Sequence, residues 1–244
     1  MKNITNFDLN LLQSFENIYV LVSGGIDSTY LWELISEKYP TKTKMVNCFN
    51  PYETSATLKQ LQQDPRFILI LPGKEIDYGQ ILRDSFRLIP KAINARKHHK
   101  YEKKIFPCCK KIKHEAFLHD PLFQQPNTVV ISGIKAGDGK IRRFFLKDLR
   151  NGNQANYSEP MERGFFHRHK EGQLYCYPFR DYNQRELPKE VIFELKQKYI
   201  TLDHSSCSIC PIVVVFKDKF KNNPHLKPSL EMYYKICNQT KLIL

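Results

Sequence analysis

The sequence has no apolar run long enough to cross a membrane, and its first residues lack the apolar core of a signal peptide. These absences predict a cytoplasmic protein without membrane contact. In that compartment cysteines are more often metal ligands or redox groups than disulfide partners. Hydrophobic residues make up 41% of the chain and charged residues 26%, a balance typical of a folded globular protein. A length of 244 residues suits one domain, expected at 1–216, with a tail or closing helix of the same domain at 217–244.

Acidic residues are scarce relative to basic ones. Lys and Arg number 38 against 25 Asp and Glu, which leaves an excess of 38 − 25 = 13 positive charges. Much of this excess falls between Lys91 and Lys113, in a stretch that matches no RNA-binding motif. The stretch is either a solvated basic face or a surface for a polyanion. The surplus suits phosphate-rich small molecules or nucleic acid as partners.

Two common nucleotide-binding motifs are also missing. A Walker A loop needs four residues between its glycines and a Lys-Ser/Thr ending, and the dinucleotide motif reads Gly-x-Gly-x-x-Gly. The chain has instead Ser-Gly-Gly-Ile-Asp-Ser-Thr at residues 23–29. The apolar, β-branched segment 18–22 precedes it, and residues 30–37 follow with apolar side chains at helical spacing.

A strand, two glycines and a helix start together form an arrangement that binds an anion. Gly24 and Gly25 allow a tight turn and a close approach of the backbone to a ligand. Unpaired N–H groups at the helix start, with the positive end of the helix dipole, face bound oxyanions. Asp27 either caps the helix or holds a metal ion beside a phosphate. Three hydroxyls offer further hydrogen bonds: Ser23, Ser28 and Thr29.

Strand and helix patterns alternate through the first half of the chain. This alternation predicts an α/β fold, with a doubly wound, mainly parallel sheet, helices on both faces and a C-terminal extension. Strands are expected at residues 18–22, 45–49, 67–71, 128–133 and 174–178. The last is expected at an edge, because Pro178 cannot donate to a ladder. Helices are expected at about 30–37, 53–62, 78–88, 187–199 and 229–236.

Two segments are expected to lie outside the regular sheet. Residues 90–107, basic and flanked by prolines, should form an excursion from it. Residues 144–172 are polar and carry an Asn-Gly-Asn turn signal, so they are expected to form a loop or lid over the carboxyl edge of the strands. Ligands of open α/β sheets bind at that edge, where residues 23–29 belong.

Four of the seven cysteines form two compact pairs, Cys108-Cys109 and Cys207-x-x-Cys210. Two thiol pairs brought together by folding could bind one metal centre, and soft thiolates select zinc or an iron–sulfur cluster. A zinc site more often uses two Cys-x-x-Cys pairs, so the vicinal pair is unusual for zinc. Free or redox-active thiols are a third interpretation.

The other cysteines and the histidines offer no such pattern. Cys48 and Cys176 fall inside expected strands, which indicates buried apolar residues. Four histidines have no ligand spacing to the cysteines and are interpreted as surface or nucleic-acid-facing: His98, His99, His167 and His169.

Taken together, these residues resemble the phosphoadenosine-phosphosulfate (PAPS) reductase family, within the PP-loop or N-type ATP pyrophosphatase superfamily. The likeness runs from about residue 15 to about residue 215, and residues 23–28 match the PP-loop itself. Four further segments are similar to family motifs in the same order: 50–54, 108–113, 132–142 and 177–182. The likeness implies the fold of the adenine nucleotide alpha-hydrolases.

The resemblance also implies roles for particular residues. An adenine nucleotide with Mg²⁺ would be bound by Ser23, Gly24, Gly25, Asp27, Ser28, Thr29 and Gly133. Asp27, Lys135 and Arg142 would act on its phosphates. The two cysteine pairs are arranged as in family members that bind a [4Fe–4S] cluster, which favours iron over zinc at Cys108, Cys109, Cys207 and Cys210.

The chain departs from the family in three places. The reductases carry a catalytic Glu-Cys-Gly-x-His near the C-terminus, whereas the late cysteine here, Cys237, has neither the glycine nor the histidine. Lys135 replaces an arginine, which keeps the charge but loses the bidentate fork. Gly139 replaces a serine. The missing cysteine motif weakens the reductase interpretation.

Three functions follow as hypotheses. The favoured one is ATP-dependent sulfur transfer (thiolation) through an adenylated intermediate, with tRNA or DNA as acceptor and a protein that donates sulfur or electrons. The second is a reductase of adenylyl sulfate or PAPS that releases sulfite, with Cys237 as nucleophile on a mobile tail. The third is a non-catalytic nucleotide-binding iron–sulfur module. A homo-oligomer is expected in each case.

Overall fold

Two compact units make up the chain in the computed structural model. The sheet unit comprises Met1–Asn47, Ser55–Leu69 and Leu118–Ser205, and the helical unit comprises Cys48–Thr54, Ile70–Phe117 and Ser206–Leu244. The residues described are 1–53, 55–71, 76–98, 106–108, 111–112, 115, 117, 120–138, 140–150, 164–169, 171–199 and 208–241. This division does not fall at residue 216, because the C-terminal residues cluster with the segment around residues 70–117.

Six strands form one sheet in the order β3-β2-β1-β4-β6-β5. Their bounds are β1 Asn17–Leu21, β2 Thr43–Cys48, β3 Phe67–Ile70, β4 Thr128–Ile131, β5 Phe166–Arg168 and β6 Leu174–Cys176. Strand β1 runs parallel to β2 and β4, and β4 runs parallel to β6, whereas β5 is antiparallel to β6. The chain builds β2 and β3 on one side of β1 before it returns to β4 on the other. The fold is therefore α/β with a mainly parallel sheet, as the sequence predicts, and its topological switch point lies between β1 and β4.

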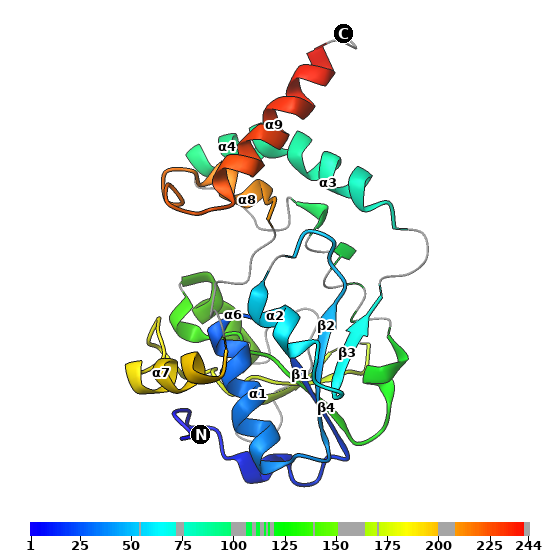
Figure 1. Ribbon diagram of the computed structural model, residues 1–244, viewed down its shortest axis with the longest axis vertical. Coiled ribbons are helices and arrows are strands. Elements are labelled where there is room, and N and C mark those ends of the chain that lie inside the picture. Colours follow the sequence, from blue (N-terminus) through cyan, green and yellow to red (C-terminus); the bar gives the residue numbers. More distant parts are fainter. Residues whose placement is uncertain are drawn as a thin grey trace. The chain divides into compact units, whose positions relative to one another are not determined.

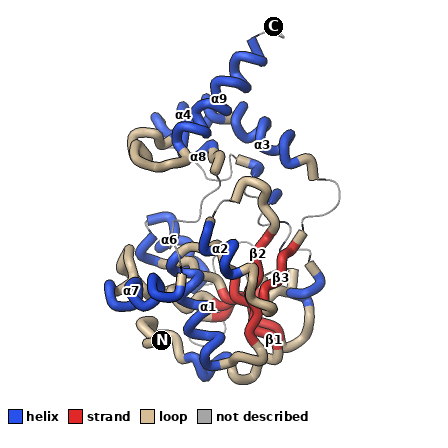
Figure 2. The backbone as a smooth tube through the Cα atoms, in the orientation of Figure 1, coloured by secondary structure: helices blue, strands red, loops and turns tan. Residues whose placement is uncertain are grey.

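Figure 2 shows the strands in red with helices beside them. Side chains along each strand alternate between the two faces of the sheet. Ile18 and Val20 join a core cluster with residues of α1 (Ile26–Lys38) and α7 (Lys189–Lys198), which contact each other. Tyr19 points to the other face, where its ring meets Phe123 of η4 (Pro121–Gln124) edge-on at 5.7 Å. On that face α6 (Lys140–Arg150) places Phe145 6.0 Å from the ring of Tyr177. Helical elements thus cover both faces.

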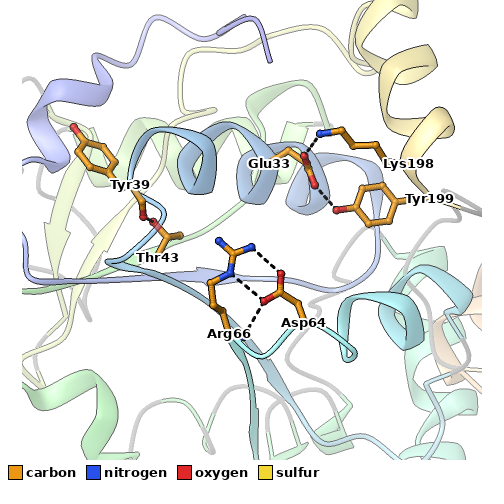
Figure 3. Close-up of polar contacts among 7 residues, drawn as sticks. All are labelled: Glu33, Tyr39, Thr43, Asp64, Arg66, Lys198 and Tyr199. Carbon is orange, nitrogen blue, oxygen red and sulfur yellow. Dashed lines mark hydrogen bonds and ion pairs between the residues drawn. The ribbon is translucent and has the colours of Figure 1, made fainter.

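Polar contacts fix α1 to the elements beside it (Figure 3). Glu33 of α1 accepts hydrogen bonds from the Tyr199 hydroxyl and the Lys198 ammonium at the end of α7. Arg66, just before β3, pairs with Asp64 at 2.7 Å and lies 4.4 Å from the centre of the Trp32 ring. These residues line a polar cavity of about 480 Å³. Its charged groups are satisfied by one another, which indicates a structural connection between α1, β3 and α7.

The helical unit is built from α3 (Tyr78–Arg87), α4 (Ile89–Lys97), α8 (Pro211–Val215) and α9 (Leu226–Lys241), seen together in Figure 1. Ile81, Leu82 and Phe86 of α3 share a separate core cluster with Ile89 of α4 and Val214 of α8. Helix α3 starts at an Asp77 cap whose carboxylate accepts the Gln80 N–H at 2.9 Å. None of the described helices is long and apolar enough to span a membrane.

Two sequence expectations about secondary structure are wrong. Strand β6 lies between β4 and β5 and is not an edge strand, since Pro178 stands beyond Cys176 and removes no ladder hydrogen bond. Residues 144–172 are not a single loop, because 144–150 belong to α6 and β5 occupies 166–168; residues 151–163 lie outside the described part of the chain. The helix expected at about 53–62 is present but shorter (α2, Ala56–Leu61). It begins after a Ser55 cap, so Glu53 precedes it.

Candidate functional site

The loop after β1 has the backbone that an anion-binding turn requires. Gly24 has φ +73°, a left-handed value that side chains rarely tolerate, and Gly25 is the extended N-cap of α1. The Gly25 carbonyl accepts the Thr29 N–H at 3.0 Å, the first hydrogen bond of the helix. The amide groups between them belong to the first turn, where no helical carbonyl is available to accept them. The sequence prediction of a glycine turn that opens a helix is confirmed here.

Hydroxyls of this loop hold the loop itself together. The Ser28 hydroxyl donates to the Gly25 carbonyl at 3.0 Å, accepts the Ser23 N–H at 3.2 Å and lies 3.3 Å from the Ser23 hydroxyl. Thr29 is fully buried, and its Oγ1 has no hydrogen-bond partner among the described residues. The backbone amides of the first turn, rather than the hydroxyls of Ser28 and Thr29, are therefore the donors best placed for an anion.

Two neighbouring segments of the chain pack against the loop 23–29 without space for larger side chains. A Cβ added to Gly24 would lie 2.1 Å from Oγ of Ser55, the cap of α2. A Cβ on Gly133, just after β4, would lie 3.4 Å from the backbone nitrogen of Ser28. The exits of β1 and β4 thus meet at the start of α1, at the switch point of the sheet. The small residue at position 133 allows this approach.

Lys135, two residues after Gly133, places its ammonium beside the loop. Its ammonium lies 2.8 Å from both carboxylate oxygens of Asp27 and 3.5 Å from Asp138. The Lys135 side chain is 3% exposed, whereas that of Asp27 is 27% exposed. Asp27 is not the cap of α1, because that position belongs to Gly25. A role of Asp27 beside a metal ion or phosphate stays a prediction. Asp27 fixes a buried lysine at the first turn of α1.

A third segment, after β6, contacts the residues that follow Lys135. The Gly137 N–H donates to the Tyr182 carbonyl at 2.9 Å, and the Ala136 N–H donates to the Phe179 carbonyl at 3.4 Å. Burial, and secondly the charge of Asp27, raise the pKa of Tyr182. Tyr182 and Asp138 are therefore site residues that sequence reasoning did not single out. The signal for Asp138 was its position three residues after Lys135, in the turn η5 (Ala136–Asp138).

Helix α6 follows that turn and carries the two arginines. Arg142 is partly exposed and Arg143 is exposed. Arg142 stays a prediction as a phosphate contact.

Two of the four predicted metal ligands are described, and both belong to the helical unit. The Cys108 N–H donates to the Ser85 hydroxyl of α3 at 3.1 Å, and the Cys210 N–H donates to the Ser229 hydroxyl of α9 at 2.9 Å. Cys108 also lies in the core cluster that Ile209 and Ile212, on either side of Cys210, pack against. Serine hydroxyls from two helices thus fix the backbone at both cysteines, in one small core.

The complete ligand set stays a prediction. Cys109 and Cys207 lie outside the described residues, and within the described part no group of three or more His, Cys, Asp or Glu could hold a metal ion. The chemistry of the donor set, two thiols on the rim of one apolar core, fits an iron–sulfur cluster or zinc.

The other cysteines and histidines have structural surroundings. Cys48 and Cys176 are buried, as expected, and burial raises the pKa of Cys176 well above its usual value. Cys237 is not on a mobile tail: it lies in α9, and its hydrogen bond with Tyr233 adds to the burial that raises the pKa of that phenol. The expectation that His167 and His169 are surface residues is wrong. Both are buried beside β6, and burial lowers the pKa of each. His98 is exposed, and His99 lies outside the described residues.

Comparisons with known proteins identify no family. No family model and no curated protein matches the chain. Among solved structures it is similar to the U34-tRNA thiolase NcsA from Methanococcus maripaludis, solved with its [4Fe-4S] cluster. That match has a TM-score of 0.35 and 11% sequence identity, and it covers 92% of this chain and 73% of that chain. Any assignment of function therefore has to come from the residues of the site.

Proposed function

We propose that the chain is a PP-loop enzyme that binds ATP at residues 23–29 and uses it for sulfur transfer to a nucleic acid. The observation that carries the proposal is Lys135, a buried ammonium held against the first turn of α1 by Asp27. A lysine beside the first-turn amides of a helix is suited to the charge of a polyphosphate. The PP-loop sequence, and the resemblance of the wider chain to the PAPS reductase family, direct the choice of ATP.

The first half-reaction would activate the acceptor. An oxygen of the acceptor base attacks the α-phosphorus of ATP, the bridging P–O bond to the β-phosphate breaks, and pyrophosphate leaves. The amides of the α1 first turn and Lys135 stabilise the negative charge that develops on the phosphates. Mg²⁺ would accompany the nucleotide, bound by its phosphates. Asp27 keeps Lys135 in place, since both of its oxygens already contact that ammonium.

The second half-reaction would introduce sulfur. A hydrosulfide ion from a donor forms a C–S bond at the activated carbon, the C–O bond breaks, and AMP leaves with the acceptor oxygen. The proton of the hydrosulfide passes to solvent. A [4Fe–4S] cluster on Cys108, Cys109, Cys207 and Cys210 would supply a soft site that holds such sulfur. The serine contacts of Cys108 and Cys210 keep these two residues fixed for that role.

Product analysis tests the proposal. Anaerobically purified protein is offered ATP, adenylyl sulfate or PAPS, each with Mg²⁺ and a thiol, with and without bulk tRNA or DNA. We expect AMP and pyrophosphate from ATP, with formation that increases when nucleic acid is added. Lys135→Met should abolish this product, whereas Lys189→Met, an exposed lysine of α7, should not.

Other products would overturn the proposal. Sulfite with AMP or 3′-phospho-AMP would establish the reductase instead. Nucleotide binding without any turnover would establish the non-catalytic module. Zinc without iron in the anaerobic protein would remove the cluster from the mechanism.

A further inference from the structure

The positive charge of the chain is concentrated in the helical unit. That unit contains 18 Lys and Arg and 8 Asp and Glu, a net charge of 18 − 8 = +10, although it is the smaller of the two. The sheet unit contains 20 and 17, a net charge of 20 − 17 = +3. The unit without the PP-loop therefore carries most of the attraction for a polyanion.

Within the helical unit the described cations are of two kinds. Arg83 and Arg87 on α3 are paired with Asp77 and Asp84, at 3.9 and 3.4 Å. On α4 and in the connection from α8 to α9, by contrast, four exposed lysines form no side-chain hydrogen bond or ion pair in the described structure: Lys91, Lys97, Lys217 and Lys221. These four ammonium groups keep their full charge available to a partner.

Arg96 joins the two segments into one surface. Its guanidinium donates to the Val215 carbonyl at the end of α8 at 2.6 Å and lies 4.8 Å from the centre of the Phe216 ring. The Lys219 ammonium lies 5.8 Å from the same ring. The C-terminal end of α4 and residues 216–221 are therefore neighbours, and Asp218 contributes a carboxylate there, 3.8 Å from Arg96. We name the cations of α4 and of residues 217–221 together the basic face: Lys91, Arg96, Lys97, Lys217, Lys219 and Lys221.

We propose that the basic face binds the phosphodiester backbone of the nucleic acid that accepts sulfur, an inference that rests on the proposed function. Lysines without carboxylate partners neutralise phosphates and release condensed counterions, a contribution independent of base sequence. Phe216 is partly covered by Arg96 and Lys219, so contacts to the backbone rather than base stacking are expected.

The same residues argue against an anionic membrane as the partner. A membrane-binding helix needs apolar side chains that can enter the lipid beside its basic ones. Ile89 and Ala92 of α4 are fully buried in the core of the helical unit and cannot enter lipid. The exposed lysines of α4, without an exposed apolar stripe of that helix beside them, fit a hydrated, regularly spaced polyanion.

The test compares two variants of the full chain with the same change in charge. The face variant is Lys91→Gln/Lys97→Gln/Lys217→Gln/Lys221→Gln. The control is Lys44→Gln/Lys59→Gln/Lys189→Gln/Lys196→Gln, four exposed lysines of the sheet unit without described ion pairs. Fluorescence anisotropy, without ATP and over a series of salt concentrations, measures binding to labelled bulk tRNA and to a labelled DNA duplex. Thermal unfolding checks that both variants are folded.

We expect the face variant to bind on the order of tenfold or more weakly. The slope of log affinity against log salt should become less steep by roughly 0.9 for each duplex phosphate that the variant no longer neutralises. The control should keep the wild-type slope. Weakening confined to tRNA or to DNA identifies the acceptor. Equal weakening of both variants, or unchanged binding of both nucleic acids by the face variant, overturns the proposal.

The outcome is distinguishable from that of the proposed function. Formation of AMP by the wild-type protein is measured separately. If the face variant no longer binds nucleic acid while the wild type makes no AMP, the basic face stands and the sulfur-transfer function fails. If AMP forms and both variants bind equally, the sulfur-transfer function stands and the basic face fails.

Discussion

Gly24 sets the backbone of the anion loop, and its replacement should be costly for two reasons. Its φ of +73° strains any side chain, and a Cβ there would lie 2.1 Å from the Ser55 hydroxyl. We expect Gly24→Ala to lower the free energy of unfolding by about 1–3 kcal/mol and to abolish ATP binding, because the loop must move away from the helix start. Urea unfolding and calorimetric titration with ATP measure the two effects.

Gly79 provides the matched control for this substitution. It lies in α3 without a positive φ, and the atoms nearest to an added Cβ would be side-chain atoms of Asp77 and Arg83, at 3.2 and 3.3 Å. Gly79→Ala should change stability by no more than about 1 kcal/mol and leave ATP binding intact. If both glycine variants kept ATP binding, the loop would not be the nucleotide site.

The Lys135–Asp27 pair allows a second prediction at this scale. The Lys135 side chain is 3% exposed. Asp27→Asn would leave its ammonium with a single carboxylate partner among the described residues, Asp138 at 3.5 Å. A buried charge that loses its partner destabilises the fold, here by about 3 kcal/mol. The midpoint of urea unfolding should therefore fall more for Asp27→Asn than for Asp138→Asn, whose contact with the ammonium is longer.

A double variant without either charge of the Lys135–Asp27 pair distinguishes the effect of the ion pair from that of side-chain packing. Asp27→Asn/Lys135→Met should be more stable than Asp27→Asn alone, because no unpaired ammonium stays buried. Strictly additive losses would show that the ion pair is not what fixes Lys135. Neither variant is expected to form AMP from ATP.

At the scale of elements, the contact between α1 and α7 should make stability depend on alkaline pH. Burial, with the hydrogen bond to Glu33, raises the pKa of Tyr199 far above that of a free phenol. Because the folded-state pKa is raised, the contribution is fully present below the unfolded pKa, about 10, and is lost as the pH rises through the folded value.

Tyr199→Phe isolates this effect from the other tyrosines. At pH 8 the variant should be less stable by about 1.5–3 kcal/mol, since a hydrogen bond to a carboxylate is lost. The difference from wild type should narrow above pH 10, by about 1.4 kcal/mol for each further pH unit. Urea midpoints between pH 8 and 11 measure it, and a constant difference would contradict the assignment.

Most of the sheet could be predicted because its signals are local. Strands β1 and β4 are continuous apolar runs that end in small residues, and helix α1 follows a glycine turn at helical spacing. The position of β6 within the sheet is not local information. It depends on β5, whose three residues, 166–168, are too short to show an alternation and lie in a stretch that the sequence predicts as a polar loop.

For the candidate site, the sequence predicts the backbone of the loop but not the contacts of its side chains. The loop 23–29 is recognisable in the sequence because glycine permits backbone conformations that other residues avoid, so the spacing of two glycines has meaning. That Ser28 and Thr29 turn inward follows from packing against other segments, which a sequence does not display. The role of Asp27 depends on Lys135, 108 residues away in the chain, and only the fold reveals that contact.

At the scale of the whole molecule, each unit has its own apolar core, so each should respond to its own cysteines. If a [4Fe–4S] cluster binds in the helical unit, its binding free energy stabilises that unit alone. Cys210→Ser should then lower the iron content and the unfolding temperature of the helical unit, while the sheet unit still binds ATP. Calorimetry and iron analysis of anaerobic protein measure these effects.

Cys176→Ser should instead destabilise the sheet unit and leave the helical unit unchanged. Cys176 is fully buried in β6, and a buried hydroxyl without a partner costs about 1–3 kcal/mol, which would fall on the sheet unit. The iron content should stay unchanged in this variant. Two calorimetric transitions that shift independently would follow from separate cores. A single transition lowered equally by both variants would instead mean that the two units unfold as one, and that the cysteines of the helical unit stabilise the PP-loop as well.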